Sequence, residues 1–157
     1  MTSVGEGGLV LLPGEARRIE MGGIDVRVHA DHAATGGAFS LVETAESIRG
    51  SGPPVHLHRD AAESFYVVAG EYEMYLEGRE FRCPAGSFIY IPTGMPHTFR
   101  SLTESSRKLN IYTPAAMVGY FGDLADAIRQ GVDDAGLADI AERYAMTVLG
   151  PAPQGYL

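Results

Sequence analysis

The chain has 157 residues, which is room for one domain of ordinary size and excludes a second catalytic domain. Hydrophobic residues make up 45% of it and charged residues 20%, which excludes a largely disordered chain, and the single Cys83 excludes an internal disulfide. Twelve basic and twenty acidic residues give a formal net charge of −8 with no basic run, which argues against nucleic acid as a partner.

The N-terminal segment shows neither a targeting signal nor a membrane span. Residues 1–8 lack the positive charge that begins a signal peptide. The only apolar run nearby, residues 9–12, is too short to cross a membrane. We therefore expect a cytoplasmic protein without a membrane partner.

Most of the chain has the pattern of an all-β protein. Short apolar, β-branched and aromatic runs alternate with turn residues such as Gly and Pro every eight to twelve positions. The sequence Glu77-Gly78 joins two of these runs and predicts a tight hairpin. The expected strands are residues 9–12, 16–21, 24–29, 38–44, 55–59, 64–68, 71–76, 79–82, 87–91, 97–101 and 108–113.

After Pro114 the period of the apolar residues changes from two to 3.6. Met117 and Phe121 fall on one face of a predicted helix that ends near Gly131. One alternative is that both side chains reach over the mouth of the β-structure; the other, which we expect, is that they pack this helix against the outer side of a sheet. A second short helix is predicted to begin after an N-cap at Asp133 or Asp134, followed by an extended tail.

Three of the five histidines, with one glutamate, have the spacing of a metal site. His56 and His58 are two residues apart, so on a strand both imidazoles share one face, roughly 6 to 7 Å apart. Glu63 opens the next strand and His97 begins a later one. Three imidazoles and one carboxylate suit Fe, Mn, Co, Ni, Cu or Zn and suit Mg or Ca poorly.

The segments around these residues resemble the two motifs of the cupin superfamily. Residues 50–70 match the first motif, G-x5-H-x-H-x4-E-x6-G, at every fixed position. Residues 86–101 match the second, G-x5-P-x-G-x2-H-x3-N, except that Ser101 replaces the final Asn. The resemblance implies a single-domain cupin whose metal ligands are His56, His58, Glu63 and His97, which hold one divalent transition metal inside a jelly-roll barrel.

This resemblance also divides the chain. Residues 1–113 are expected to form the cupin jelly-roll barrel, with N-terminal strands in 1–45 and the metal-binding core in 50–101. Residues 114–157 are expected to form helices and a tail that pack on the barrel within the same domain. The fold class is therefore all-β with a short C-terminal helical appendage.

A small-molecule pocket is expected beside the metal. Phe65 and Val67 share strand parity with Glu63, and Phe99 shares it with His97, so these side chains are expected to face inward and contact a substrate. Tyr112 is placed with them as a substrate-binding residue. Residues 38–44, 88, 90 and 110 are further wall positions, but the sequence leaves open which parity points inward there.

The region after residue 114 is similar to the tail of cupins of the quercetin 2,3-dioxygenase type. That similarity implies a dioxygenase that binds the deprotonated hydroxyl of an enol, phenol or flavonol-like substrate at the metal and adds O2, releasing CO. Glu63 is proposed both as ligand and as the catalytic proton acceptor. Two alternatives stay open: a redox-neutral cupin, such as an isomerase, cyclase, decarboxylase or lyase, and a binding protein without turnover.

The expected macromolecular partner is a second copy of the chain. Jelly rolls leave sheet edges exposed, and the unpaired backbone groups of an edge strand can pair with a second chain. The N-terminal strand at residues 9–12 is predicted to pair across a homodimer.

Overall fold

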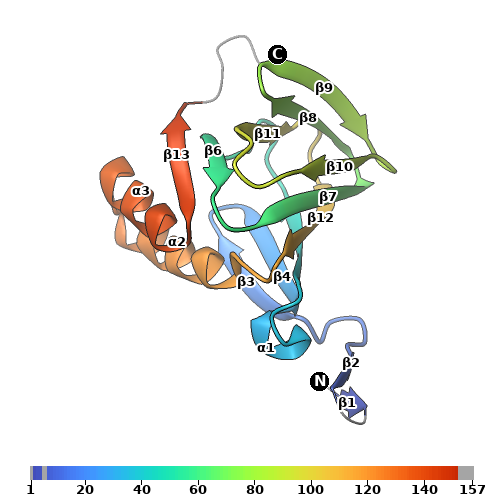
Figure 1. The fold of residues 1–157 in the computed structure, drawn as a ribbon. Coiled ribbons are helices and arrows are strands. Elements are labelled where there is room, and N and C mark those ends of the chain that lie inside the picture. The colour runs from blue at the N-terminus through green and yellow to red at the C-terminus, as the bar shows by residue number, and fades with distance from the viewer. Residues whose placement is uncertain (1, 5–6, 152–157) are drawn as a thin grey trace.

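Two antiparallel sheets face each other in the computed structural model, which describes residues 2–4 and 7–151 (Figure 1). The larger sheet has six strands in the order β10 (Phe88–Ile91), β7 (Ala62–Ala69), β12 (Ser106–Thr113), β5 (Ser40–Glu46), β4 (Ile24–Ala30) and β3 (Arg17–Met21). The smaller sheet has the order β13 (Met146–Gly150), β6 (Val55–His58), β11 (His97–Ser101), β8 (Glu71–Leu76) and β9 (Arg79–Pro84). This arrangement confirms the predicted all-β jelly roll with a C-terminal helical region.

The large sheet is built from strands that alternate in burial, as one-sided strands do. In β12 the residues Ser106, Lys108, Asn110 and Tyr112 are buried, and the residues between them are partly exposed. The neighbouring strand β5 buries every second residue from Ser40 to Glu46 in the same way. Because alternate side chains share a face, these two strands direct a continuous row of residues into the barrel.

The segment before β6 is fixed against β11 by backbone contacts. The amide of Gly50 donates to the carbonyl of Ser101 at 2.8 Å, and the amide of Ser101 donates to Ser51 at 2.9 Å. A Cβ at Gly52 would lie 1.8 Å from the carbonyl oxygen of Phe99, so only glycine allows this approach. These contacts fix the position of the start of β6 relative to β11.

A glycine of the second cupin-like motif shapes the turn between β10 and β11. Gly94 has a φ of 80°, which glycine adopts without strain. Its amide donates to the carbonyl of His58 at 2.7 Å, so the turn is joined directly to β6. The predicted bend therefore brings β11 beside β6, where His97 is the register partner of His56.

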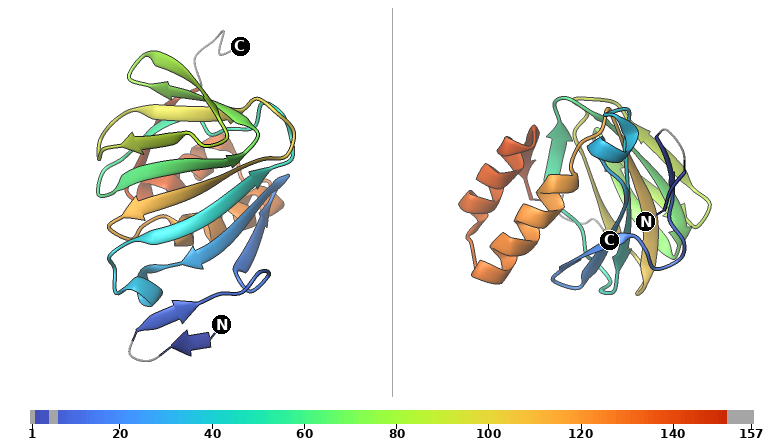
Figure 2. Two further views of the ribbon diagram at one scale, coloured as in Figure 1. Left: turned by 90° about the vertical axis from the view of Figure 1, so that its right-hand side faces the viewer. Right: turned by 90° about the horizontal axis from the view of Figure 1, so that it is seen from below.

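The two predicted helices are present as α2 (Val118–Gln130) and α3 (Asp134–Arg143). Asp133 is the N-cap of α3 and accepts a hydrogen bond from the amide of Gly136 at 3.0 Å. Both helices lie on one side of the barrel, next to β13 and β3 (Figures 1 and 2). None of the helices in the described residues is long and apolar enough to cross a membrane.

The sequence did not predict β13, the strand that follows α3. It pairs antiparallel with β6, with Met146 opposite His58 and Val148 opposite His56. The strand carrying two predicted ligands therefore lies inside the smaller sheet rather than at its edge.

At the N-terminus, the predicted strand at 9–12 is shorter and has a partner within the chain. It forms β2 (Gly8–Val10), which pairs with β1 (Thr2–Val4) in a separate two-stranded sheet. This hairpin stands apart from both large sheets (Figure 2). A short helix, α1 (His32–Thr35), lies between β4 and β5.

Candidate metal centre

The four predicted ligands lie together inside the barrel. His56 and His58 come from β6, Glu63 from β7 and His97 from β11, and each is at most 5% exposed. Their ligand atoms all lie within 4.8 Å of one another. The two facing sheets thus converge on one point, because β6 and β11 belong to one sheet and β7 to the other.

Backbone carbonyls fix two of the imidazole rings. Nδ1 of His56 donates to the carbonyl of Pro54 at 2.9 Å, and Nδ1 of His97 donates to the carbonyl of Met95 at 2.9 Å. A carbonyl oxygen only accepts hydrogen bonds, so each Nδ1 carries the proton and each neutral ring keeps its lone pair on Nε2. A hydrogen bond of this kind on the other ring nitrogen orients histidines that bind metal.

The contacts of Glu63 fit a cation at this point. Nε2 of His58 and Nε2 of His97 each lie 3.0 Å from Oε2 of Glu63. A neutral His97 with its proton on Nδ1 places a lone pair against a carboxylate oxygen, an arrangement that needs a cation or a further proton between them. Two ligand atoms at right angles, each about 2.1 Å from a shared ion, lie about 3.0 Å apart. The donor set and spacing therefore fit a transition metal.

The pKa shifts of Glu63 and His56 agree with that fit. Burial would raise the pKa of Glu63, but the neighbouring His58 and His97 outweigh burial and hold the pKa well below its usual value. Burial, followed by the nearby His97, lowers the pKa of His56 to about 3. Neutral imidazoles and an ionised carboxylate are the forms that bind metal at neutral pH.

Tyr112 lies beside Glu63 on the adjacent strand. It is the register partner of Glu63 across β12 and β7, and its ring meets the ring of His58 edge-on with centroids 5.6 Å apart. Burial first, and then the charge of Glu63, raises the pKa of the Tyr112 hydroxyl well above its usual value. The hydroxyl therefore stays protonated beside the carboxylate.

A cavity of about 760 Å³ extends from three of the predicted ligands, His56, His58 and Glu63, toward the C-terminal helices, and His97 is not among its lining residues. Of the predicted substrate-binding residues, Phe99 and Tyr112 line it. Phe65 and Val67 do not; they lie one and two alternate positions beyond Glu63, in a packed core with Tyr72, Met74 and Ile91. The prediction of inward orientation was correct for both, but their side chains belong to this packed core and not to the cavity wall.

The C-terminal helices form the other wall. Met117 and Phe121 line the cavity, so the expectation that they only pack the helix on the outer side of a sheet was wrong. Apolar side chains of α2, α3 and β13 continue this wall: Tyr120, Leu124, Ile128, Leu137, Ala138, Met146 and Val148. The period of 3.6 identified an apolar face on α2 but did not indicate what that face covers.

The sequence did not predict the buried polar group at the inner end of the cavity. Lys108 is fully buried, and its Nζ donates to Glu46 at 2.6 Å and to Thr44 at 2.7 Å. Tyr72 also donates to Glu46, and the ammonium group lies 3.9 Å from the ring centroid of Phe99. Thr44 and Glu46 line the cavity. Lysine is rarely buried, so only the alternation of residues 106–112 could have indicated its position.

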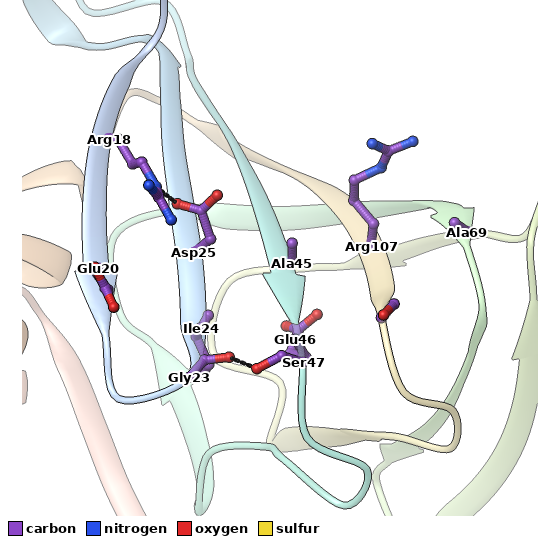
Figure 3. A pocket seen from close by; sticks show the side chains of 11 residues that line it. Arg18, Glu20, Gly23, Ile24, Asp25, Ala45, Glu46, Ser47, Ala69 and Arg107 are labelled. Carbon is purple, nitrogen blue, oxygen red and sulfur yellow. Dashed lines mark hydrogen bonds and ion pairs between the residues drawn. The ribbon is translucent and has the colours of Figure 1, made fainter. Parts of the chain in front are cut away.

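A second hollow lies on the outer face of the large sheet, over β3, β4, β5 and β12 (Figure 3). Its most exposed cation, Arg18, is paired with Asp25 at 2.5 Å, and Arg107 on β12 lies 3.9 Å from a carboxylate oxygen of Glu43. The hollow contains none of the four clustered ligands. The inner cavity is therefore the candidate site.

Comparisons with known proteins agree with this geometry. Residues 47–112 match the cupin domain family. Quercetin 2,3-dioxygenase from Bacillus subtilis (strain 168) is 30% identical over 111 residues, which are 71% of this chain and 32% of that protein. The matched region thus spans 32% and 50% of the lengths of two curated relatives.

Solved structures show the same fold. The structure of KdgF from Halomonas sp. has a TM-score of 0.61 at 23% identity and covers 68% of this chain and 94% of its own. A predicted oxalate decarboxylase from Thermotoga maritima has a TM-score of 0.60 at 19% identity and covers 68% and 99%. With its two facing sheets, its clustered histidines and glutamate, and the matched domain, this chain belongs to the cupin superfamily.

Proposed function

We propose that the chain is a metal-dependent dioxygenase of the quercetinase type that acts on a small enol, phenol or flavonol-like substrate. The observation that carries the proposal is the buried His56, His58, Glu63 and His97 cluster at the end of a large, mainly apolar cavity. The similarity to quercetin 2,3-dioxygenase supports the choice of reaction.

The charges of the ligands favour an anionic oxygen at this site. Three neutral imidazoles and one carboxylate leave a divalent ion with a net charge of +1. Such an ion supplies Lewis acidity, and a redox-active one also supplies electron transfer to O2. An enolate or phenolate oxygen matches this charge better than a neutral donor.

The residues of the chain bind and deprotonate the substrate. Glu63 is ionised at neutral pH and accepts the proton of the substrate hydroxyl, while the Tyr112 hydroxyl stays protonated and orients the carboxylate. Phe99, Met117 and Phe121 enclose the apolar part of the substrate and exclude water from it.

The first test is metal content. Plasma mass spectrometry on untagged protein is expected to find nearly one transition metal per chain, and a His56→Ala/His97→Ala double variant is expected to lose it. His32→Ala is the matched control, because His32 is exposed on α1 and lies outside the cluster. A wild-type protein that contains no metal and cannot be loaded with one contradicts the proposal.

The second test separates the reaction classes. With 3-hydroxyflavone, O2 uptake and CO release are expected; with flavone, which lacks the 3-hydroxyl, neither is expected. Turnover of an enol substrate without O2 uptake would instead indicate a redox-neutral cupin. Binding without turnover of any enol or phenol would indicate a binding protein.

A further inference from the structure

On the inner face of β12, the three polar residues nearest the metal centre form a row that leads away from it, and Ser106 follows them at the far end of the strand. Tyr112 lies opposite Glu63, Asn110 opposite Phe65 and Lys108 opposite Val67. Alternate residues on one face of a strand are about 7 Å apart along it. Asn110 is therefore one such step deeper in the barrel than the ligand Glu63.

The two inner members of this row differ in their hydrogen bonding. The ammonium group of Lys108 contacts Thr44 and Glu46, and Glu46 also accepts a hydrogen bond from Tyr72, so that group is internally satisfied. Asn110 is 3% exposed and lines the cavity, yet its Oδ1 has no hydrogen-bond partner among the described residues. Buried polar atoms are hydrogen-bonded in nearly all folded proteins, so a buried acceptor on a cavity wall points to a partner supplied by a ligand.

The surroundings define what such a ligand looks like. The wall of the same cavity includes Phe99 and the apolar side chains of α2, which suit a flat ring. A ring that places one oxygen at the metal centre directs its opposite edge along β12 toward Asn110. Oδ1 of an amide only accepts hydrogen bonds, so that edge must present a donor.

We propose that Asn110 is a specificity-determining residue that accepts a hydrogen bond from a hydroxyl group at the far edge of an aromatic ligand whose near edge is bound at the metal centre. The preferred ligand class is thus an aromatic molecule with oxygen substituents on opposite sides of the ring. This inference rests on the proposed metal-binding function, but it concerns recognition and not the oxygenation step.

The test measures binding to the protein loaded with Zn²⁺, so that no turnover interferes. Three hydroxamates serve as probes: benzohydroxamate, 4-hydroxybenzohydroxamate and 4-methoxybenzohydroxamate. All three present the same chelating group to the metal, but only the 4-hydroxy compound places a hydrogen-bond donor on the opposite side of the ring. Calorimetry is expected to show about 5- to 10-fold tighter binding of the 4-hydroxy compound, the range of one neutral hydrogen bond.

Asn110→Leu is expected to abolish this preference while zinc content and benzohydroxamate affinity stay within about twofold of the wild type. If that variant does not fold, Asn110→Ala serves in its place with the same expected result. Equal binding of the three probes to the wild type, or a preference that persists without Asn110, overturns the inference but leaves the metal centre intact. A wild type that binds neither zinc nor any hydroxamate overturns the proposed function as well.

Discussion

Replacement of the buried Lys108 by methionine tests whether the polar group at the inner end of the cavity holds the barrel together. The substitution keeps most of the side-chain volume but removes an ammonium group that lies 2.6 Å from Oε1 of Glu46. Glu46 is 1% exposed, so its charge then stays buried with only the hydroxyls of Thr44 and Tyr72 as donors. Removal of one partner of such a pair destabilises a protein by about 3 to 5 kcal/mol.

Urea unfolding of the metal-free protein, followed by circular dichroism, measures this effect. With a slope of about 2 kcal/mol/M, Lys108→Met is expected to lower the unfolding midpoint by about 1.5 to 2.5 M. Adding Glu46→Gln removes the stranded charge and is expected to restore at least half of the loss, because both charges are then absent.

The matched control is an ion pair at the surface. Arg59 and Glu142 are also 2.6 Å apart, but their side chains are 41% and 50% exposed, so Arg59→Met is expected to cost at most about 1 kcal/mol. If Lys108→Met costs no more than this control, or if the double variant is as unstable as the single one, the reasoning about the buried pair is refuted.

Three further predictions concern other parts of the chain. The Cβ of Gly52→Ala would overlap the Phe99 carbonyl, so this variant is expected to lose more than about 3 kcal/mol of stability in urea unfolding. Gly122→Ala, with open space around it on α2, is the control and is expected to be neutral or stabilising by about 0.5 to 1 kcal/mol. Equal effects of the two substitutions would contradict the steric argument. Burial, and then Glu71, raises the pKa of Cys83 above its ordinary value of 9.0, so the native protein is expected to react with a thiol reagent more slowly than the urea-unfolded protein. The stability that this thiol contributes is present below pH 9 and is lost as the pH rises toward the pKa of the folded state. Equal labelling rates of native and unfolded protein would contradict the expected protection. We propose a homodimer that depends on the N-terminal hairpin, so deletion of residues 1–15 is expected to give a monomer or an aggregate by light scattering, and a truncated protein that is still dimeric would refute this role.

The metal centre was the most predictable part of the structure. His56 and His58 had to share a face because they are two residues apart on a strand, and the motif spacing supplied Glu63 and His97. All four lie within one cluster. Strand parity and turn chemistry are local properties, and a sequence shows them directly.

The cavity was less predictable, because its shape depends on depth and on distant segments. Parity indicates that Phe65 faces inward like Glu63 but not that it packs in a core with Tyr72 and Met74 instead of lining the cavity. The apolar face of α2 contacts the cavity only because β13 and α3 bring the C-terminal region against β6. Such contacts between residues far apart in the sequence leave no periodic signal within either segment.

The pairing of β13 with β6 links the metal centre to the order in which the chain is made. The four ligands lie between residues 56 and 97, but the strand with His56 and His58 acquires its outer neighbour only when residues 146–150 are available. Until then β6 has a single neighbour in its sheet, β11, and its other edge is unpaired. A nascent chain therefore carries every ligand well before it holds them in place, and stable metal capture is expected to follow synthesis of β13 rather than of the ligands themselves.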